Sequence, residues 1–131
     1  MKKLSTFLLA LALSPIVALA ADKFADISHD ELKKAISEKK VALIDVNGPD
    51  SFKAGHIPGA IEFTANEKNL AAKLPKDKGA LVVAYCGNEE CGAYAAAAKK
   101  ATELGYTNVK HYSKGIAGWK KAGEKTEAAG S

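Results

Sequence analysis

Short apolar runs recur along the chain and predict buried strands. Residues 41–46 and 80–85 are apolar at nearly every position, rather than at alternate positions, and are rich in branched side chains. Such continuous runs are typical of strands that are covered on both faces, as in a parallel sheet. Two further short strands are expected over residues 61–63 and 107–112.

The segments between these runs have the features of helices. Ser28 and Glu31 form an S-x-x-E capping box, which predicts a helix over residues 28–39. Further helices are expected over residues 49–54, 67–74, 92–104 and 116–122. Strands that alternate with helices predict an α/β fold with a parallel sheet. In such sheets, ligands bind beyond the carboxyl ends of the strands.

The N-terminal segment has the pattern of a secretory signal peptide. Lys2 and Lys3 precede an uncharged stretch over residues 4–20, which ends in small residues at Ala18 and Ala20. A membrane anchor is the alternative, but this stretch is at the lower limit for spanning a bilayer. We therefore expect a bacterial-type signal peptide over residues 1–20, cleavage after Ala20, a periplasmic or secreted protein, and no stable membrane insertion after cleavage.

Length and charge narrow the class of protein further. The 131 residues suffice for one domain, which we place at residues 21–123, and the polar residues 124–131 are expected to be a flexible tail. The chain has 19 basic and 15 acidic residues, and two of the basic ones lie in the predicted signal peptide. The remaining positive excess is too small to indicate a nucleic-acid-binding protein.

The two cysteines carry the clearest candidate chemistry. Cys86 follows the most apolar predicted strand, and Cys91 lies near the start of the next predicted helix. Backbone N–H groups of a loop and a helix N-terminus stabilise an anion, so this position favours the thiolate of Cys86 or a persulfide on it. The alternative is that Cys86 is a small buried apolar residue. The scattered histidines and two cysteines lack the close spacing of a zinc site.

Five segments together resemble the rhodanese family of sulfurtransferases. They are residues 43–46 (LIDV), 55–60 (GHIPGA), 82–86 (VVAYC), 104–109 (LGYTNV) and 115–119 (GIAGW). The resemblance implies a rhodanese-like α/β fold, with a central five-stranded parallel sheet flanked by helices on both faces. It also implies that Cys86 takes a sulfane sulfur from a small donor, or from a protein, and passes it to a thiol or another thiophilic acceptor. No metal or organic cofactor is required.

The loop that begins at Cys86 bears on the substrate. In the family, a loop of this length, residues 86–91, suits sulfur substrates, whereas a longer loop that ends in arginine suits phosphate or arsenate. Basic residues are common in this loop, but here Glu89 and Glu90 are present instead, which disfavours the thiosulfate dianion. Persulfides, polysulfides or a protein donor are expected to be preferred. The expected active-site loop comprises Cys86, Gly87, Asn88, Glu89, Glu90, Cys91 and Gly92.

Several alternatives stay open from the sequence. Cys91 is either a resolving thiol that attacks a persulfide on Cys86 or a packing residue at the start of the helix. Asp45 and His56 either support the reaction or order neighbouring backbone through hydrogen bonds. Accordingly, two further functions compete with sulfur transfer. They are a thiol–disulfide or polysulfide redox protein that uses both cysteines, and a sulfur-carrier or binding module without catalysis.

Overall fold

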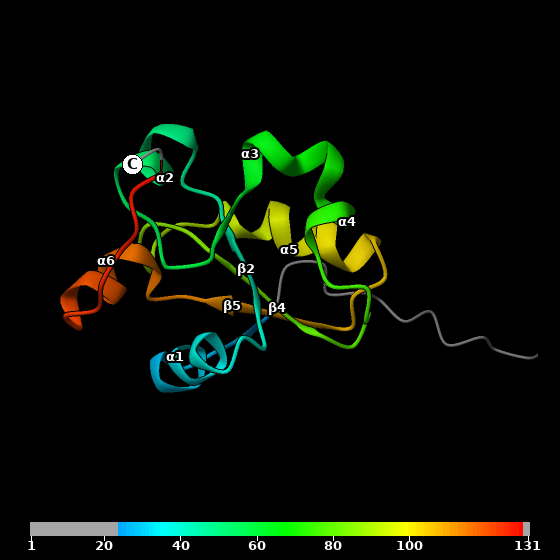
Figure 1. Cartoon of the computed structure of the whole chain (residues 1–131), viewed down its shortest axis with the longest axis horizontal. Helices are drawn as coiled ribbons and strands as arrows, with labels where there is room; N and C mark the ends of the chain where they lie inside the picture. The colour runs from blue at the N-terminus through cyan, green and yellow to red at the C-terminus, as the bar shows by residue number, and fades with distance from the viewer. Residues whose placement is uncertain (1–23, 130–131) are drawn as a thin grey trace, which may run out of the picture.

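The computed structural model describes residues 24–129, which form a five-stranded parallel sheet with helices on both faces (Figure 1). The strand order is β1-β5-β4-β2-β3, and every pairing is parallel. The strands are β1 (Ala25–Asp26), β2 (Ala42–Asp45), β3 (Ile61–Glu62), β4 (Leu81–Tyr85) and β5 (Asn108–Tyr112). The α/β class and the five-stranded parallel sheet expected above are confirmed.

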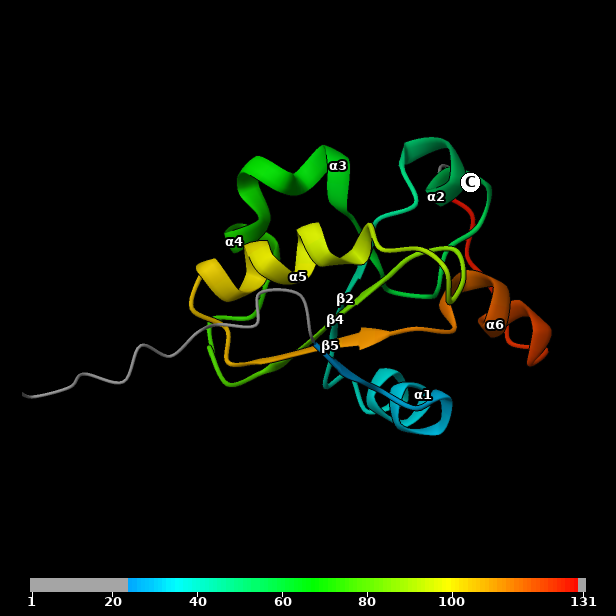
Figure 2. The same ribbon diagram turned by 180° about the vertical axis from the view of Figure 1, so that it is seen from behind.

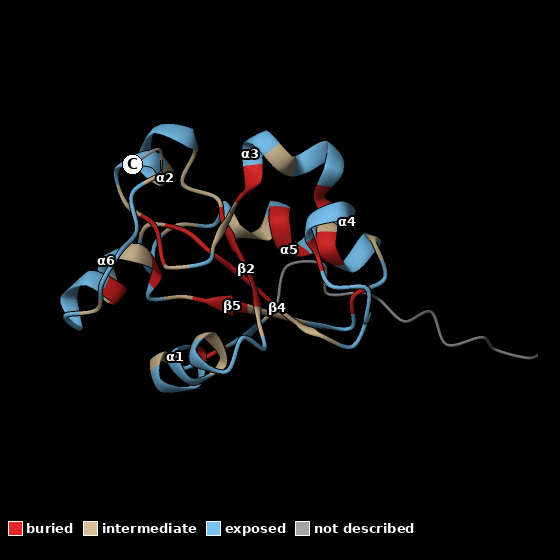
Figure 3. Cartoon of the chain, viewed as in Figure 1, coloured by how far each residue is buried: buried red, intermediate tan, exposed pale blue. Residues whose placement is uncertain are grey.

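The central strands β2 and β4 are almost entirely buried. All four residues of β2 and the last four of β4 are buried, as the red strands of Figure 3 show. Asp45 pairs with Tyr85, and Tyr85 pairs with Tyr112, so three strands end at one level. The loops that follow these strands therefore meet at one edge of the sheet.

Two separate apolar cores lie on the two faces of the sheet. Helices α1 (His29–Ser37) and α6 (Gly115–Lys121) cover one face and bury Leu32 and Trp119. The other face is covered by α3 (Phe63–Asn66), α4 (Leu70–Lys73) and α5 (Tyr94–Glu103), as Figures 1 and 2 show. The strand residues contribute side chains to both cores, because successive side chains of a strand point to opposite faces.

The helix ends follow the expected local chemistry. The capping box is present: the Ser28 hydroxyl accepts from the Glu31 amide, and the Glu31 carboxylate accepts from the Ser28 amide. The short helix α2 (Pro49–Ala54) has its proline in the first turn, where no amide donor is needed. Helix α5 lays three fully buried alanines against the sheet, which allows a close approach: Ala97, Ala98 and Ala101.

The segment after β3 differs from the expected strand and helix. Phe63 begins α3 instead of ending a strand, because the buried Glu62 carboxylate accepts from the amides of Thr64 and Ala65 and so caps the helix. The helix expected over residues 67–74 is split into the 3₁₀ turn η1 (Glu67–Asn69) and α4. The edge strand β1 was not expected, since two residues carry no periodic pattern.

The residues after α6 pack on the domain, whereas their composition predicts a flexible tail. Glu127 forms two backbone hydrogen bonds of 2.9 Å with His56, one in each direction. Lys33 and His29 donate hydrogen bonds to the Glu124 carboxylate, and these bonds lower its pKa. The backbone of residues 124–129 therefore follows a defined path over α1 and α2.

The expected signal peptide at residues 1–20 lies outside the described residues. Among residues 24–129, no helix has both the length and the apolar character needed to cross a bilayer.

Candidate active site

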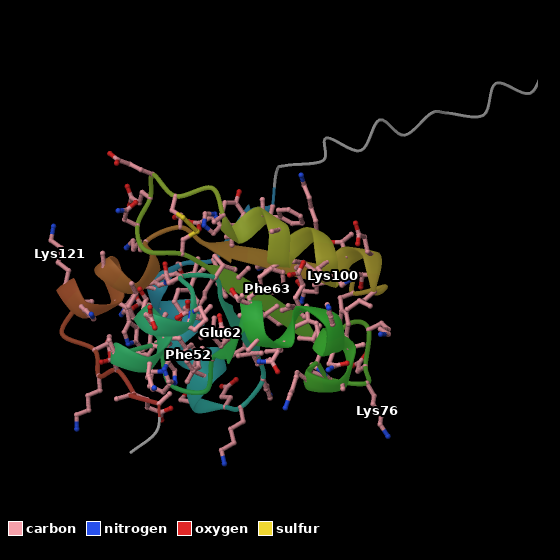
Figure 4. All side chains as sticks on the ribbon, turned by 90° about the horizontal axis from the view of Figure 1, so that it is seen from above. Phe52, Glu62, Phe63, Lys76, Lys100 and Lys121 are labelled. Carbon is pink, nitrogen blue, oxygen red and sulfur yellow. A yellow bond between two sulfur atoms is a disulfide. The ribbon has the colours of Figure 1, made fainter. Side chains whose placement is uncertain are left out.

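The loop from Cys86 to Ala93 joins β4 to α5 at the carboxyl edge of the sheet, and its disulfide is visible as the yellow bond in Figure 4. Cys86 is 1% exposed, whereas Cys91 is partly exposed. The two residues are joined by a disulfide, with their Cα atoms 6.0 Å apart. The bond places Cys91 directly against the sulfur that the sequence marks as a nucleophile.

A tight turn within the loop returns the chain to Cys86. The Asn88 side-chain oxygen accepts from the Glu90 amide at 3.0 Å, and the Asn88 carbonyl accepts from the Cys91 amide at 3.2 Å. Asparagine favours such turns because its side chain bonds to the backbone two residues further on. The turn leaves Glu89 and Glu90 exposed at the tip of the loop.

The start of α5 is directed at Cys86. The Tyr94 amide donates to the Cys86 Sγ at 3.0 Å, and no side chain caps this helix end. The first amides of a helix carry partial positive charge, which stabilises a negative charge placed against them. The site can therefore hold Cys86 as a thiolate, or its sulfur in a persulfide anion.

Helix α6 holds the other side of the loop. The amides of Ile116 and Ala117 donate to the carbonyls of Cys86 and Gly87, at 3.0 and 2.9 Å. At Gly115, φ is +60°, and a Cβ there would lie 2.6 Å from the Cys86 carbonyl oxygen. Only glycine fits at this position, since a side chain would collide with the backbone of the loop.

A groove of about 710 Å³ lies between the tip of the loop and α6. Glu89 and Glu90 line the loop side, and Lys114 and Lys121 line the helix side; Figure 4 shows Lys121 at the outer end of α6. The loop alone predicts an acidic site, but the two lysines balance the two carboxylates formally. The groove thus presents opposite charges on its two walls.

The Asp45 side chain is buried at the end of β2, where it accepts hydrogen bonds from neighbouring groups. One carboxylate oxygen accepts from the Asn47 amide at 2.7 Å, and the other accepts from the Tyr85 hydroxyl at 2.6 Å. Burial, followed by the charge of Asp45 and its hydrogen bond, raises the pKa of Tyr85 far above its usual value. The phenol therefore stays protonated, and both carboxylate oxygens serve to order the ends of β2 and β4.

His56 belongs to the contact between α2 and the C-terminal segment. Its Nδ1–H donates to the Phe52 carbonyl at 2.8 Å, and its ring stacks on the Phe52 ring with centroids 3.7 Å apart. Its other nitrogen lies 3.8 Å from the Glu127 carboxylate. These contacts order the turn. They agree with the alternative in which His56 orders neighbouring backbone through hydrogen bonds.

Two polar side chains near the loop were not identified as site residues from the sequence. The His111 ring stacks on Tyr94 with centroids 3.3 Å apart, and burial lowers the pKa of His111. The Asn47 side-chain amide lies beside Gly87, and its Nδ2 is buried with no hydrogen-bond partner among the described residues. The apolar-strand pattern gives no signal for either contact, because each joins two segments that are separated along the chain.

The described part of the chain offers no set of metal ligands. Among residues 24–129, no three or more histidine, cysteine, aspartate or glutamate side chains are grouped so that they could hold a metal ion.

Comparisons with known proteins agree with this fold. Residues 28–122 match the family model described as rhodanese-like domain. The thiosulfate sulfurtransferase GlpE of Tolumonas auensis is 29% identical over 99 residues, which cover 75% of this chain and 90% of that protein. A crystal structure of a Bacillus halodurans protein is 26% identical with a TM-score of 0.68, covering 79% of this chain and 77% of that one.

A further solved structure shows the same fold at lower identity. It is the polysulfide-sulfur transferase homodimer of Wolinella succinogenes, which is 23% identical with a TM-score of 0.64. The match covers 83% of this chain and 82% of that one.

Proposed function

Because this chain belongs to the rhodanese-like domain family, we propose that it is a sulfurtransferase that carries a sulfane sulfur as a persulfide on Cys86. The observation that supports Cys86 as the nucleophile is the 3.0 Å hydrogen bond from the Tyr94 amide to its Sγ at the start of α5. The similarity to thiosulfate sulfurtransferase GlpE supports sulfur transfer as the reaction class.

The reaction has two displacement steps at sulfur. In the first, the reduced Cys86 thiolate attacks the sulfane sulfur of a donor, and the rest of the donor leaves with the electron pair of the broken bond. In the second, a thiolate or another thiophilic acceptor attacks the outer sulfur, and Cys86 leaves as a thiolate. The Tyr94 amide and the α5 dipole stabilise the sulfur anion before and after each step.

The charges of the groove favour some donors over others. Glu89 and Glu90 stand at the tip of the loop, and carboxylates repel a dianion such as thiosulfate. Lys114 and Lys121 on the opposite wall offset part of this repulsion. We therefore propose persulfides, polysulfides or a protein-bound sulfur as preferred donors, with a small thiol or a protein thiol as acceptor.

The test uses the reduced protein with polysulfide as donor and a small thiol as acceptor. Cys86→Ser should lower sulfur transfer to the uncatalysed rate, because the hydroxyl has no anionic form near neutral pH. Intact mass should rise by about 32 Da in the wild type and not in Cys86→Ser. Unchanged transfer by Cys86→Ser would remove Cys86 from the mechanism. A wild type that gains no sulfur would indicate a binding module instead.

We further propose that the protein is exported to the periplasm. The support is the basic, apolar and small-residue pattern of residues 1–20. N-terminal sequencing of protein recovered from a periplasmic extract should begin at Ala21. A full-length N-terminus in the cytoplasmic fraction would contradict export.

A further inference from the structure

The Cys86–Cys91 disulfide blocks the proposed nucleophile. A cysteine in a disulfide has no thiolate, so the oxidised protein cannot take a sulfur from a donor. Sulfur uptake needs both cysteines in the reduced state, so the disulfide must form in a later step of the reaction. The direct bond between the two sulfurs indicates which step forms it.

We propose that Cys91 discharges the sulfur of the Cys86 persulfide as hydrosulfide, which makes the protein a reductase of sulfane sulfur. This inference rests on the proposed function, because it needs a persulfide at Cys86. It goes beyond that function, because the sulfur leaves as hydrosulfide and needs no external acceptor.

The step balances without a further reactant. The Cys91 thiolate attacks the Sγ of a protonated persulfide on Cys86, the Sγ–Sγ bond forms, and the bond to the outer sulfur breaks. The outer sulfur leaves with the electron pair and the persulfide proton as hydrosulfide. The two cysteine sulfurs together lose two electrons, and the sulfane sulfur gains them.

The structure selects the inner sulfur as the point of attack. The Asn88 turn brings Cys91 back until its Sγ bonds to the Sγ of Cys86, which is the inner sulfur of a persulfide. Attack on the outer sulfur would only move the persulfide to Cys91 and would leave no disulfide. The bond that the structure contains is therefore the product expected from attack at the inner sulfur.

The different exposure of the two cysteines indicates which sulfur a reductant attacks when the disulfide is reduced again. Cys91 is partly exposed and Cys86 is 1% exposed, so a dithiol reductant reaches the Cys91 sulfur first. The reductant then forms a mixed disulfide with Cys91, and Cys86 leaves as a thiolate against the Tyr94 amide. A stabilised leaving thiolate departs faster. The second thiol of the reductant releases Cys91, and the dithiol ends as a disulfide.

The experiment follows a single loading of the reduced protein under anaerobic conditions. Wild type, Cys91→Ser and Cys86→Ser are treated with inorganic polysulfide, desalted rapidly, and followed by intact mass and a hydrosulfide assay. Wild type should release one hydrosulfide per chain without added thiol and end about 2 Da below the reduced mass. Cys91→Ser should gain about 32 Da and hold that sulfur at least about tenfold longer.

The outcomes separate this inference from the proposed function. If Cys91→Ser loses its sulfur at the wild-type rate, or wild type keeps the added mass and releases no hydrosulfide, Cys91 is not a resolving thiol, and persulfide transfer stands. If neither wild type nor Cys91→Ser gains sulfur and no hydrosulfide is released, the proposed function fails, and this inference fails with it. Release of hydrosulfide from Cys86→Ser at the wild-type rate would also overturn both.

Discussion

The Tyr85 hydroxyl donates a hydrogen bond of 2.6 Å to the Asp45 carboxylate, and this bond connects the ends of β4 and β2. The same hydroxyl accepts from the Ile57 amide at 3.0 Å, so it also holds the segment between α2 and β3. Tyr85 directly precedes Cys86 in the chain. The position of the candidate nucleophile therefore depends on a buried network that makes no contact with substrate in the proposed reaction.

Removal of the Tyr85 hydroxyl should destabilise the fold. In Tyr85→Phe, the buried Asp45 carboxylate and the Ile57 amide each lose a partner, and an unsatisfied buried group costs about 1–3 kcal/mol. Urea unfolding should show this loss. Tyr112→Phe is the control, because within residues 24–129 the Tyr112 hydroxyl bonds only to the partly buried His29 ring, and its removal should cost less. Equal losses in the two variants would contradict the importance of the Asp45 bond.

Alkaline pH should destabilise the protein through its buried tyrosines. Burial raises the pKa of Tyr112 to about 12, and the charges of Glu124 and Asp26 add to the shift. A tyrosine in the unfolded chain has a pKa of about 10. Since the folded-state pKa is higher, this contribution to stability is complete below pH 10 and is lost as the pH rises from about 10 to about 12.

The measurement is the Tm of wild type and Tyr112→Phe between pH 8 and pH 12. The Tm of the wild type should fall further than that of Tyr112→Phe across the upper part of this range, because the variant has no phenol to ionise at that position. Lysine deprotonation affects both proteins equally. Parallel curves would show that Tyr112 does not contribute to the alkaline loss.

The sequence predicts those parts of the fold that depend on local patterns. Residues 80–85 were expected to be a strand because they are uniformly apolar, and β4 covers Leu81–Tyr85. Residues 28–39 were expected to be a helix from the Ser28 capping box, and α1 covers His29–Ser37. By contrast, β1 is held only by pairing with β5 across the sheet, which no local pattern of two residues can indicate.

Some features of the candidate site can likewise be predicted from local sequence patterns, and others depend on long-range packing. The apolar run before Cys86 predicts that Cys86 lies at the end of a strand. The short spacing to Cys91 predicts that Cys86 also lies close to the start of a helix. The Tyr94 amide bond could be anticipated only as a general helix-end effect. The contact of Gly115 with the Cys86 carbonyl, and the lysines that face the acidic loop, arise from the docking of α6. That docking depends on long-range packing of Trp119 in the core.

Substitution of Gly115 should disturb the loop far more than a comparable glycine elsewhere. Gly115→Ala combines a positive φ of +60° with a Cβ 2.6 Å from the Cys86 carbonyl oxygen. Gly123→Ala is the matched control, because Gly123 also has a positive φ, +80°, but has nothing within 4 Å of its Cβ position. The backbone cost of about 1–2 kcal/mol is common to both variants.

The difference between these two variants then measures the close approach of α6 to the loop. Gly115→Ala should lose more stability in urea than Gly123→Ala and should lose most of its sulfur loading, because the loop carbonyls must move away from α6. Gly123→Ala should keep normal loading. Similar stability and loading in the two variants would mean that the loop adapts to the added methyl group.

The charged walls of the groove should tune the choice of donor. Glu89 and Glu90 line one side of the groove, and Lys114 and Lys121 line the other. Glu89→Gln combined with Glu90→Gln should lower the KM for thiosulfate by about fivefold, because each carboxylate near the dianion opposes its binding. The KM for a neutral trisulfide donor should change little. Lys114→Gln combined with Lys121→Gln should shift the thiosulfate KM in the opposite direction, and added salt should shrink both effects.

Glu103→Gln, at the far end of α5, is the control for a general change in net charge. Equal shifts for the charged and the neutral donor, or an effect of Glu103→Gln as large as that of the loop variants, would show that the walls of the groove do not contact the donor.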